Sequence, residues 1–384
     1  MSKKSAYLNH PLIQNRLEEV QVNINQIIAG GFSPQQFCLM PFVNIILEPN
    51  GSVGLCRHKG TEHSLGNLKE QTWQEIWNGT KAQQWRQEFL EGRARTCRTE
   101  IDDQGCNLCP QLGKMFPDDP KTLKAKTSSP LRLTANFNGF CNLQCQMCDV
   151  WELPNGFYTD ENFWNPARKE LFPHLREIDM LSGEPFLQQD TYKLIDEVSL
   201  VNPNCLWSIT TNAHWNWNTR VESALEKIKI KNIILSVDSF DPETYHKIRK
   251  PGILSKVLKT IDHFREYEEK RIKNQLTPLH MNLNFLVQKD NWREIPNALH
   301  YCLSRNIHPF ITFCYRPSEH SLLTLSQEKR SEIIGHMLST YTWDELCLSH
   351  RVLSPLIHSL PAIDKVYALD TMKRYKKEYE ARAN

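Results

Sequence analysis

The chain has 384 residues, of which 40% are hydrophobic and 23% are charged, and its formal net charge is +2. This composition is that of a folded globular protein, and it excludes a disordered chain or one that coats nucleic acid. No apolar run approaches the ~20 residues of a membrane span, and the first ten residues lack the apolar core of a signal peptide. We therefore expect a soluble cytoplasmic protein without a membrane or nucleic-acid partner.

Twelve cysteines are many for a reducing compartment, where they indicate metal or redox chemistry rather than disulfides. Eight of the twelve lie between Cys38 and Cys148, and these are the candidate metal ligands. The others are scattered, as buried structural cysteines are. They are Cys205, Cys302, Cys314 and Cys347.

The first predicted element is a helix over residues 11–29, followed by Gly30-Gly31 as a C-cap. It either packs against the fold or gates the mouth of a barrel, and packing is the usual role of an amphipathic helix. Two strand-like runs follow, Val43–Leu47 and Ser52–Cys56, with Asn50-Gly51 between them. Asn-Gly between such runs is the strongest short signal for a β-hairpin.

Helices are predicted after the hairpin, around residues 73–77 and over 81–92, and three further cysteines follow them. A hairpin pair of cysteines that faces a C-x2-C pair can close a tetrahedron around a metal. The preferred ligands of this segment are Cys38, Cys56, Cys106 and Cys109. Cys97 is a spare ligand or replaces one of them, and a zinc ribbon is the alternative for this segment taken alone.

Residues 113–130 are rich in Pro, Asp and Lys and predict a linker. Beyond it, predicted strands alternate with helices, and repeated βα units predict a parallel sheet in an α/β fold. The predicted strands are 131–137, 176–182, 206–212, 232–239, 280–288 and 309–316. The predicted helices are 192–200, 219–230, 254–273, 293–305 and 327–338. Residues 321–384 form a helical C-terminal extension.

Three of these strands have a polar face, because side chains alternate between the two faces of a strand. The polar sets are Ser208, Thr210 and Asn212; Ser236 and Asp238; and Asn282, Asn284 and Gln288. Since helices cover the outside of a parallel sheet, we expect these faces to point inward, toward a bound polar ligand. Exposed edge strands are the alternative.

Cys141, Cys145 and Cys148 have C-x3-C-x2-C spacing and follow the first strand of this region. Three thiolates from one loop can bind one metal site and leave a fourth corner open. In iron–sulfur chemistry, another molecule must then complete the coordination of one iron. Half of a zinc site is the alternative on spacing alone.

The segment FNGFCNLQCQMC, which contains these cysteines, resembles the signature of the radical S-adenosylmethionine (SAM) enzymes. The resemblance implies a partial (β/α)6 TIM-like barrel over residues 131–320, with a [4Fe–4S] cluster on Cys141, Cys145 and Cys148 and with SAM on its open iron. It implies cleavage of SAM to a 5′-deoxyadenosyl radical, which takes hydrogen from a C–H bond of a peptide or small-molecule substrate. The implied partner is a reductant such as flavodoxin or ferredoxin.

The N-terminal cysteines resemble the twitch, or SPASM-like, domain of these enzymes. The matching residues are Cys38, Gly51, Cys56, Gly66-Asn67-Leu68, Glu75-Ile76-Trp77, Cys106 and Cys109. This resemblance implies a hairpin-plus-helix domain over residues 37–112, after a helix within residues 1–36, which holds an auxiliary [4Fe–4S] cluster and precedes the barrel. Such a cluster favours an oxidative outcome.

The resemblance also assigns contacts to SAM. The segment Ser182-Gly183-Glu184-Pro185 matches the Gly-Gly-Glu-Pro sequence that binds the SAM amino group, with Ser182 in place of the first Gly. Asp238 matches the segment that meets the ribose, and Arg249 reaches the SAM carboxylate or is a surface cation. The full set of cofactor-binding candidates is Met147, Ser182, Gly183, Glu184, Thr210, Asn212, Ser236, Asp238 and Arg249.

Two segments leave the function open. His214, Trp215 and Trp217 follow the third strand and either stack on a ring of a ligand or pack the loop. The sixth strand lacks the glycine-containing sequence with which the family contacts adenine. The rival function is a non-enzymatic zinc-binding protein that uses both groups of cysteines to bind a partner.

Overall fold

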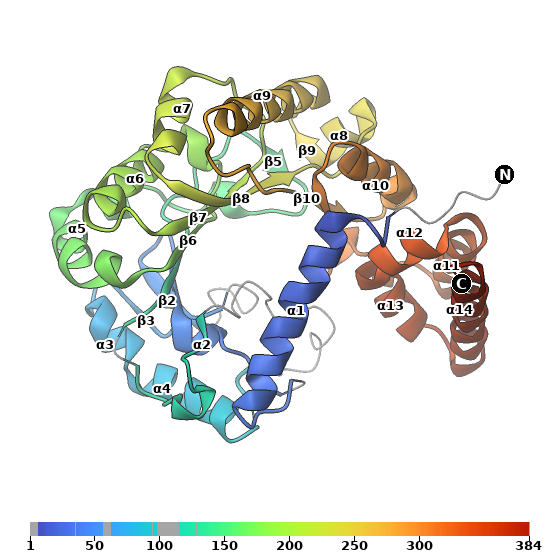
Figure 1. Cartoon of the computed structure of the whole chain (residues 1–384), viewed down its shortest axis with the longest axis horizontal. Coiled ribbons are helices and arrows are strands. Elements are labelled where there is room, and N and C mark those ends of the chain that lie inside the picture. Colours follow the sequence, from blue (N-terminus) through green and yellow to red (C-terminus); the bar gives the residue numbers. More distant parts are fainter. Residues whose placement is uncertain are drawn as a thin grey trace.

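The computed structural model describes residues 7–34, 36–56, 63–93, 95–97, 115–127 and 129–383. Its strands are β1 (Asn44–Leu47), β2 (Ser52–Gly54), β3 (Gly66–Asn67), β4 (Arg132–Ala135), β5 (Gln144–Cys145), β6 (Glu177–Met180), β7 (Leu206–Thr211), β8 (Lys229–Ser236), β9 (Arg249–Lys250), β10 (Met281–Val287) and β11 (His308–Phe313). Nine of them form one sheet in the order β11-β10-β8-β7-β6-β4-β1-β2-β3, and β5 pairs with β9 (Figure 1).

The helices before the fourth strand are α1 (Pro11–Ala29), α2 (Met40–Val43), α3 (Trp73–Trp77) and α4 (Thr80–Leu90). Those that alternate with the later strands are α5 (Glu161–Pro166), α6 (Gln189–Val201), α7 (Thr219–Glu226), α8 (Pro242–Ile248), α9 (Leu254–Lys273) and α10 (Ile295–Ser304). The C-terminal helices are α11 (Gln327–Thr340), α12 (Trp343–Leu348), α13 (His350–His358) and α14 (Ala362–Ala383). None of the helices described has the length and apolar character that would let it cross a membrane.

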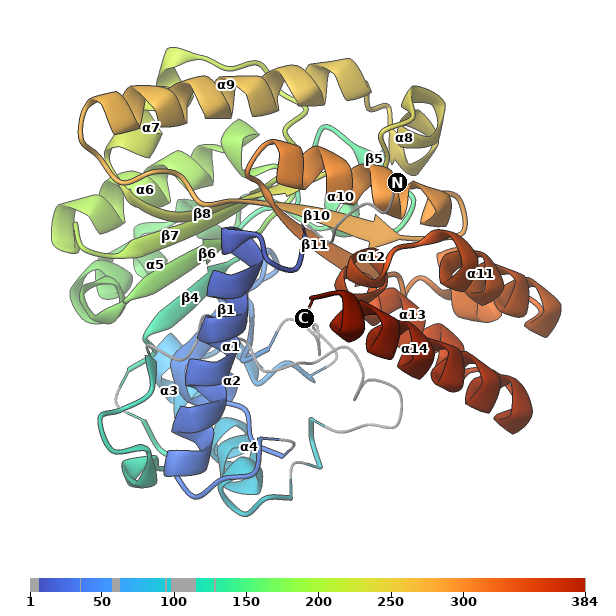
Figure 2. The same cartoon turned by 45° about the vertical axis from the view of Figure 1, so that its right-hand side comes forward.

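Strands β4, β6, β7, β8, β10 and β11 pair in parallel, which confirms the α/β fold and the partial barrel of six βα units. Helices α6, α7, α9 and α10 cover one face of this sheet (Figure 2). Two predicted helices, 11–29 and 254–273, have the predicted bounds.

The predicted helix over residues 219–230 is too long. Helix α7 ends at Glu226, and Lys229 and Ile230 already pair with Leu206 and Trp207 of β7. The apolar spacing of this segment is compatible with a helix, but the hydrogen bonds of the neighbouring strand extend β8 toward its N-terminus. The same strand ends at Ser236, so residues 237–239 of its predicted range lie in the following loop.

The two faces of the sheet differ in polarity as predicted. In β10 the side chains of Met281, Leu283, Phe285 and Val287 are buried, and those of Asn282 and Asn284 are half-buried on the opposite face. Asn284 lies opposite Ser236 of β8 and accepts a hydrogen bond of 3.0 Å from Thr312 of β11. The apolar face packs under the helices, and the polar face lines the inside of the barrel.

The inner face of β4 and β6 is charged, which the sequence analysis missed. The guanidinium of Arg132 is buried between Glu177 at 3.2 Å and Asp179 at 2.8 Å. Lys231 of β8 forms an ion pair with the second oxygen of Glu177. We call these four side chains the barrel-floor network, because they lie near the N-terminal ends of their strands.

The predicted hairpin is confirmed, and it is part of the barrel sheet. Strand β1 pairs in parallel with β4, while β2 and β3 extend the sheet antiparallel. Gly51 has a φ of 83°, and a Cβ at this position would lie 2.5 Å from the ring of Phe157. The hydroxyl of Tyr158 donates to the carbonyl of Glu48 at 2.8 Å, so the loop after Cys148 packs on the hairpin.

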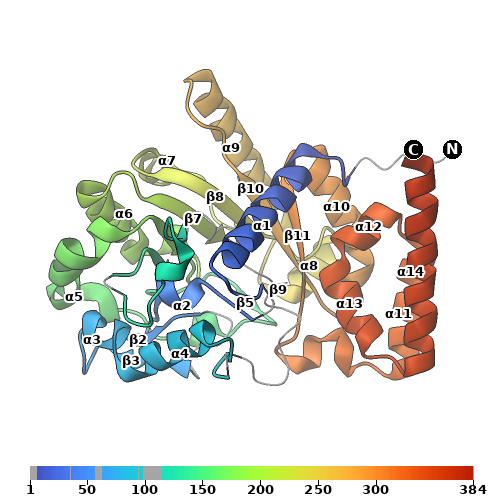
Figure 3. The same ribbon diagram turned by 60° about the horizontal axis from the view of Figure 1, so that its bottom comes forward.

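The predicted linker is packed where it is described, since Met115, Phe116 and Pro120 are buried. Helix α1 also packs, as the more usual of its two predicted roles requires. It begins near β10 and β11 and runs to the region of α2 and α4 (Figures 1 and 2). Helices α11 and α14 lie side by side beyond β11, and α9 projects from the rest of the molecule (Figure 3).

The contact between α1 and β11 predicts a pH dependence of stability. Burial lowers the pKa of His308 to about 4, with further contributions from Arg16 and His10 of the N-terminal segment and an opposing one from Glu19. The ordinary value is 6.5, so the native state binds fewer protons than the unfolded state between these values. We therefore expect the stability from this group to be present above pH 6.5 and to be lost as the pH falls toward 4.

The measurement is the urea midpoint of unfolding between pH 4 and 7. His308→Asn should flatten the decline of this midpoint with acid, because the substituted side chain does not titrate. An equal decline in both proteins would contradict the prediction.

Candidate active site

The loop with Cys141, Cys145 and Cys148 follows β4 at the carboxyl end of the sheet. Its middle is held by a short antiparallel ribbon, in which Cys145 pairs with Arg249. The N–H of Gln146 donates to the carbonyl of Ile248 at 2.9 Å. Carboxyl ends of barrel strands are where such folds place their chemistry.

The three thiols of this loop lie close enough to influence one another's ionisation. Burial raises the pKa of Cys145 to about 12, against the favourable charge of Arg249, and the neighbouring Cys148 and Cys141 raise it further. Burial also raises the pKa of Cys141 and of Cys148. The metal-free thiols therefore keep their protons near neutral pH, and metal binding has to release them.

The segment Ser182-Gly183-Glu184 lies directly against the backbone that precedes Cys141. The carbonyl of Asn138 accepts hydrogen bonds from the Ser182 hydroxyl and from the N–H of Gly183, the latter at 3.2 Å. A Cβ on Gly183 would lie 2.1 Å from the carbonyl oxygen of Phe140. Glycine is therefore required at position 183 by the close approach of the two loops.

Glu184 ties the end of β6 to the end of β7. Its fully buried carboxylate accepts from the Thr211 hydroxyl at 2.8 Å and from the N–H of Asn212 at 2.7 Å. Burial raises the pKa of Glu184 to about 7, although these hydrogen bonds oppose the shift. In this structure Glu184 braces the strand ends.

Asn212 and His214 hold the cysteine loop from the side of β7. The amide of Asn212 donates to the Asn142 side chain at 3.0 Å and to the sulfur of Cys141 at 3.6 Å. The Asn142 amide in turn donates to the carbonyl of His214 at 2.6 Å and lies 3.3 Å from Nδ1 of the same residue. Because Nδ1 faces an amide donor, the proton of the neutral imidazole belongs on Nε2.

Asp238 and Arg249 form a buried ion pair, in which Nε of Arg249 donates to one oxygen of Asp238 at 2.8 Å and Nη2 lies 2.6 Å from the same oxygen. The other oxygen of Asp238 accepts from the N–H of Leu286 at 2.9 Å. Arg249 is 7% exposed, so it is not a surface cation, which was one of its two predicted roles. Its Nη1 lies 3.9 Å from the sulfur of Cys145. Both residues thus lie at the cysteine loop, and Asp238 already has partners.

Three polar atoms around this loop are buried and lack a hydrogen-bond partner among the described residues. They are Nε2 of His214, the hydroxyl of Tyr245 and Nε2 of Gln288. Each is linked to the loop: His214 through Asn142, Gln288 through a 2.9 Å hydrogen bond from Gln146, and Tyr245 through α8, which ends just before Arg249, the partner of Cys145 in the ribbon. Buried donors are rarely left unpaired, so this environment fits a polar ligand such as SAM.

In the described part of the chain, no three His, Cys, Asp or Glu side chains are close enough to share one metal ion. A [4Fe–4S] cluster binds each thiolate at a different iron, so its ligands need not approach so closely. The donor set of three thiols with no fourth side chain fits such a cluster.

The remaining candidates have different surroundings. Met147 is half-buried within the loop, and Thr210 and Ser236 are half-buried on the inner face. Trp215 is buried against Phe186 at 4.8 Å, and its indole donates to Thr211. Trp217 packs against Phe264. The two tryptophans therefore serve loop packing, which was one of their two predicted roles.

In the N-terminal segment, Cys38, Cys56 and Cys97 are half-buried and pack against the core. The sulfur of Cys38 accepts from the N–H of Met40 at 3.4 Å. Glu88 of α4 accepts from both the N–H and the hydroxyl of Thr96, next to Cys97. Cys106 and Cys109 lie outside the described residues, so their part in the ligand set stays a prediction.

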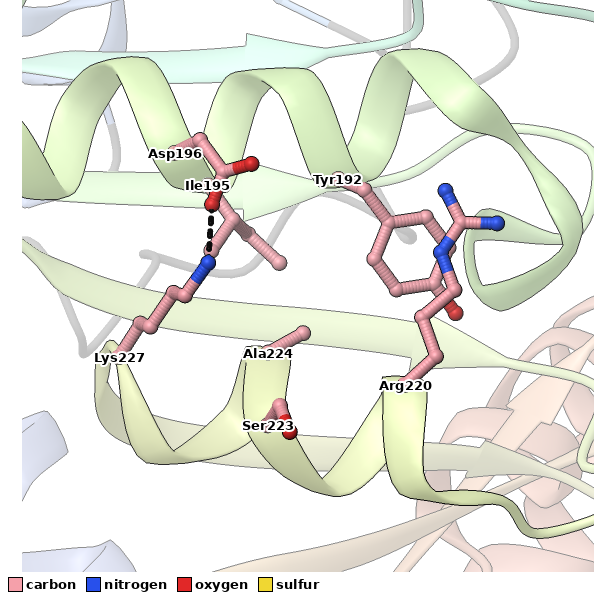
Figure 4. Close-up of a pocket in the computed structure, with 7 residues that line it drawn as sticks. All are labelled: Tyr192, Ile195, Asp196, Arg220, Ser223, Ala224 and Lys227. Carbon is pink, nitrogen blue, oxygen red and sulfur yellow. Dashed lines mark hydrogen bonds and ion pairs between the residues drawn. The ribbon is translucent and has the colours of Figure 1, made fainter.

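A cavity of about 200 Å³ lies between α6 and α7, in the helix layer outside the sheet (Figure 4). The guanidinium of Arg220 covers the ring of Tyr192 at 3.7 Å, and Lys227 pairs with Asp196 at 2.6 Å. Each charged side chain of this cavity thus has a partner in the cavity's own walls, and none of the predicted site residues lines it.

Two family models match the chain. The radical SAM superfamily model matches residues 135–302, and the SPASM model of an iron–sulfur cluster-binding domain matches residues 38–110. The first range contains Cys141, Cys145 and Cys148, and the second contains the five N-terminal cysteines.

Curated relatives include a GTP 3′,8-cyclase from Sulfurovum sp., 29% identical over 212 residues, which are 53% of this chain and 60% of the relative. A probable GTP 3′,8-cyclase from Methanocaldococcus jannaschii is 28% identical over 187 residues, 47% of this chain and 58% of the relative. The chain thus spans less than two thirds of the length of these relatives.

Among solved structures, Streptococcus suis SuiB bound to S-adenosylmethionine matches with a TM-score of 0.40 and 16% identity over 70% of this chain and 60% of that one. Native anSMEcpe with bound AdoMet matches with a TM-score of 0.42 and 17% identity over 57% and 62%.

The close approach at Gly183 gives a test of the site geometry. Gly183→Ala should displace the backbone before Cys141, because the added Cβ would collide with main-chain atoms that no side-chain rotation can move. We expect iron in anaerobically purified protein to fall from about eight to about four atoms per chain, as one of two [4Fe–4S] clusters is lost.

The matched control is Gly335→Ala in α11, where a Cβ has nothing within 4 Å. It should keep the iron content of the unchanged protein. Full iron in Gly183→Ala would show that the two loops do not depend on each other.

Proposed function

We propose a function for this chain from the premise that it belongs to the radical SAM superfamily and carries its SPASM-type iron–sulfur domain N-terminal to the barrel. Its cofactors are accordingly a [4Fe–4S] cluster with SAM and a second, auxiliary cluster. When bound and reduced, the first cluster cleaves SAM and supplies the 5′-deoxyadenosyl radical that removes hydrogen from a substrate C–H bond. The observation that carries the proposal is the set of three unpartnered buried donors around the three-thiol loop.

In this proposal Cys141, Cys145 and Cys148 bind three irons, and the remaining groups position the loop and SAM. Asn212 and Arg249 place N–H groups beside the sulfurs of Cys141 and Cys145, where such contacts raise the reduction potential of a cluster. Asp238 holds Arg249 in place and would therefore contribute to SAM binding through that cation. It would also accept a hydrogen bond from a ribose hydroxyl.

Ser182, Gly183 and Glu184 would contact the SAM amino group. Thr210 and Ser236 face the inside of the barrel, where the ribose and the substrate would lie. Met147 would pack against the adenine as its apolar neighbour.

The substrate we propose is a peptide or small molecule whose reacting part is polar and uncharged. On the inner face of the described strands, the cations Arg132 and Lys231 are already paired with Glu177 and Asp179. A nucleoside triphosphate such as the GTP named for the curated relatives would need cations that are free to meet its phosphates. The uncharged amides and hydroxyls of Asn282, Asn284 and Thr312 suit a neutral polar group better.

We propose an oxidative outcome, in which the substrate radical loses an electron and a proton after hydrogen removal. The auxiliary cluster, when bound, would take up that electron. A reductant such as flavodoxin or ferredoxin would supply the electron that starts the reaction, in a cytoplasmic compartment.

The first experiment replaces the three cysteines of the three-thiol loop. A Cys141→Ala, Cys145→Ala and Cys148→Ala protein should lose all cleavage of SAM, because no thiolate remains to hold the cluster that delivers the electron. The measurement is 5′-deoxyadenosine released under dithionite in anaerobic solution. A colourless, zinc-loaded wild-type protein would instead support the rival, a non-enzymatic zinc-binding module.

The second experiment concerns the auxiliary ligands. We expect Cys38→Ala with Cys56→Ala, and separately Cys106→Ala with Cys109→Ala, to lower iron to about four atoms per chain. SAM cleavage without substrate should persist in both variants, because the barrel cluster is intact. Full iron and normal turnover would contradict the auxiliary cluster. Cys97→Ala serves as the comparison that shows whether Cys97 is a spare cysteine or a ligand.

A further inference from the structure

We propose that Asn44 is a positioning residue for the auxiliary cluster, because it fixes the peptide unit that enters Cys56 to the barrel-floor network. The inference rests on the proposed function, since it takes Cys56 as a cluster ligand.

The register of the hairpin places Asn44 beside Cys56. Leu47 pairs with Val53 and Ile46 with Gly54, and the ladder ends there. The same register would set Asn44 opposite Cys56. Beyond the end of the ladder, a side-chain hydrogen bond joins the two strands: Nδ2 of Asn44 donates to the carbonyl of Leu55 at 3.0 Å.

That carbonyl is part of the peptide unit that also contains the N–H of Cys56. A peptide unit is planar and rigid, so a hydrogen bond that fixes its carbonyl also fixes the direction in which the chain enters Cys56. On the other side of the hairpin, Asn44 directly follows α2, and the sulfur of Cys38 contacts the first N–H of that helix. Asn44 therefore connects to the backbone segments that carry both half-buried thiols.

The opposite end of the amide is held by the barrel. Oδ1 of Asn44 accepts from Nη1 of Arg132 at 2.8 Å and from the hydroxyl of Thr134 at 3.1 Å. A guanidinium only donates and a carbonyl only accepts, so the orientation of the amide is fixed by chemistry. Asn44 is 1% exposed, and water has little access to replace either contact.

The charges behind Asn44 keep Arg132 immobile. Its guanidinium is shared among Glu177, Asp179 and Asn44, and Lys231 completes the pairing of Glu177. A buried guanidinium with this many partners cannot move without leaving a charge unpaired. Through Asn44 and Arg132, the Leu55 carbonyl is thus held in a fixed position relative to β4 and β6. These strands lead to the three-thiol loop and to Gly183.

The test uses Asn44→Asp in the Cys141→Ala, Cys145→Ala and Cys148→Ala protein, which leaves only the auxiliary cluster. The aspartate keeps the size of the side chain and an acceptor for Arg132, but a carboxylate oxygen replaces the N–H that meets the Leu55 carbonyl. We expect iron release to a chelator to become about tenfold faster, the effect of one lost buried hydrogen bond. The electron paramagnetic resonance signal and midpoint potential of the cluster should also shift.

The matched control is Thr134→Val, which removes the hydroxyl that donates to Oδ1 of Asn44 and accepts from Nη1 of Arg132, and which leaves Asn44 bonded to both Arg132 and the Leu55 carbonyl. Its iron release and potential should equal those of the background protein. Asn44→Ser is a second variant, whose shorter hydroxyl should give an intermediate rate. The melting temperature of each metal-free protein shows whether a variant has failed to fold.

Release and potential unchanged in Asn44→Asp, or changed equally in Thr134→Val, would overturn the inference and leave the proposed function intact. A background protein without any iron would refute the auxiliary cluster itself, and the inference with it. The two failures are therefore distinguishable by the iron content of the background protein.

Discussion

The parallel pairing of β1 with β4 is the constraint on which the rest of the structure depends. It runs from Asn44 opposite Arg132 to Leu47 opposite Ala135, and it makes the N-terminal hairpin a part of the barrel sheet. Strand β4 leads directly to the loop of Cys141, and β1 directly follows the segment of Cys38. The segments of Cys38 and Cys141, which are about a hundred positions apart in the sequence, are thus placed relative to each other by four backbone pairs.

This pairing is accompanied by a charge arrangement that is costly to bury. Taking Arg132, Glu177 and Asp179 out of water is offset only if each charge is paired and hydrogen-bonded, which the floor network achieves. Buried ionic networks contribute little net stability compared with apolar packing. A displaced member is costly, however, because it leaves a buried charge unpaired. We regard the network as a device that specifies the register between β1, β4 and β6.

The sequence was sufficient for features that depend on local pattern. The strand–helix alternation, the Asn50-Gly51 hairpin and the polar faces of β7, β8 and β10 all follow from periodicity and turn chemistry, and the structure confirms them. The polar face of β4 and β6 was missed because Arg132, Glu177 and Asp179 look like surface charges in isolation. Only their pairing across two neighbouring strands makes burial possible, and that pairing is not local.

The same limit applies to the candidate site. The spacing of Cys141, Cys145 and Cys148 and the segment around Gly183 are local signals, and the structure brings them together at one end of the sheet. The partners of Asp238 and Glu184 were not predictable, since a buried carboxylate looks the same in sequence whether it accepts from a ligand or from the protein. Here both accept from the protein.

That difference bears on how the site works. Carboxylates that already have partners serve to hold other groups rigidly. The donors of His214, Tyr245 and Gln288, which lack a partner among the described residues, are the ones that a ligand can satisfy. Preorganised donors in a buried site lose little on binding, because the protein has already ordered them and excluded water around them. Within the described part of the chain, the free hydrogen-bonding capacity of this site therefore lies on these three donors, and its rigidity lies in the paired carboxylates.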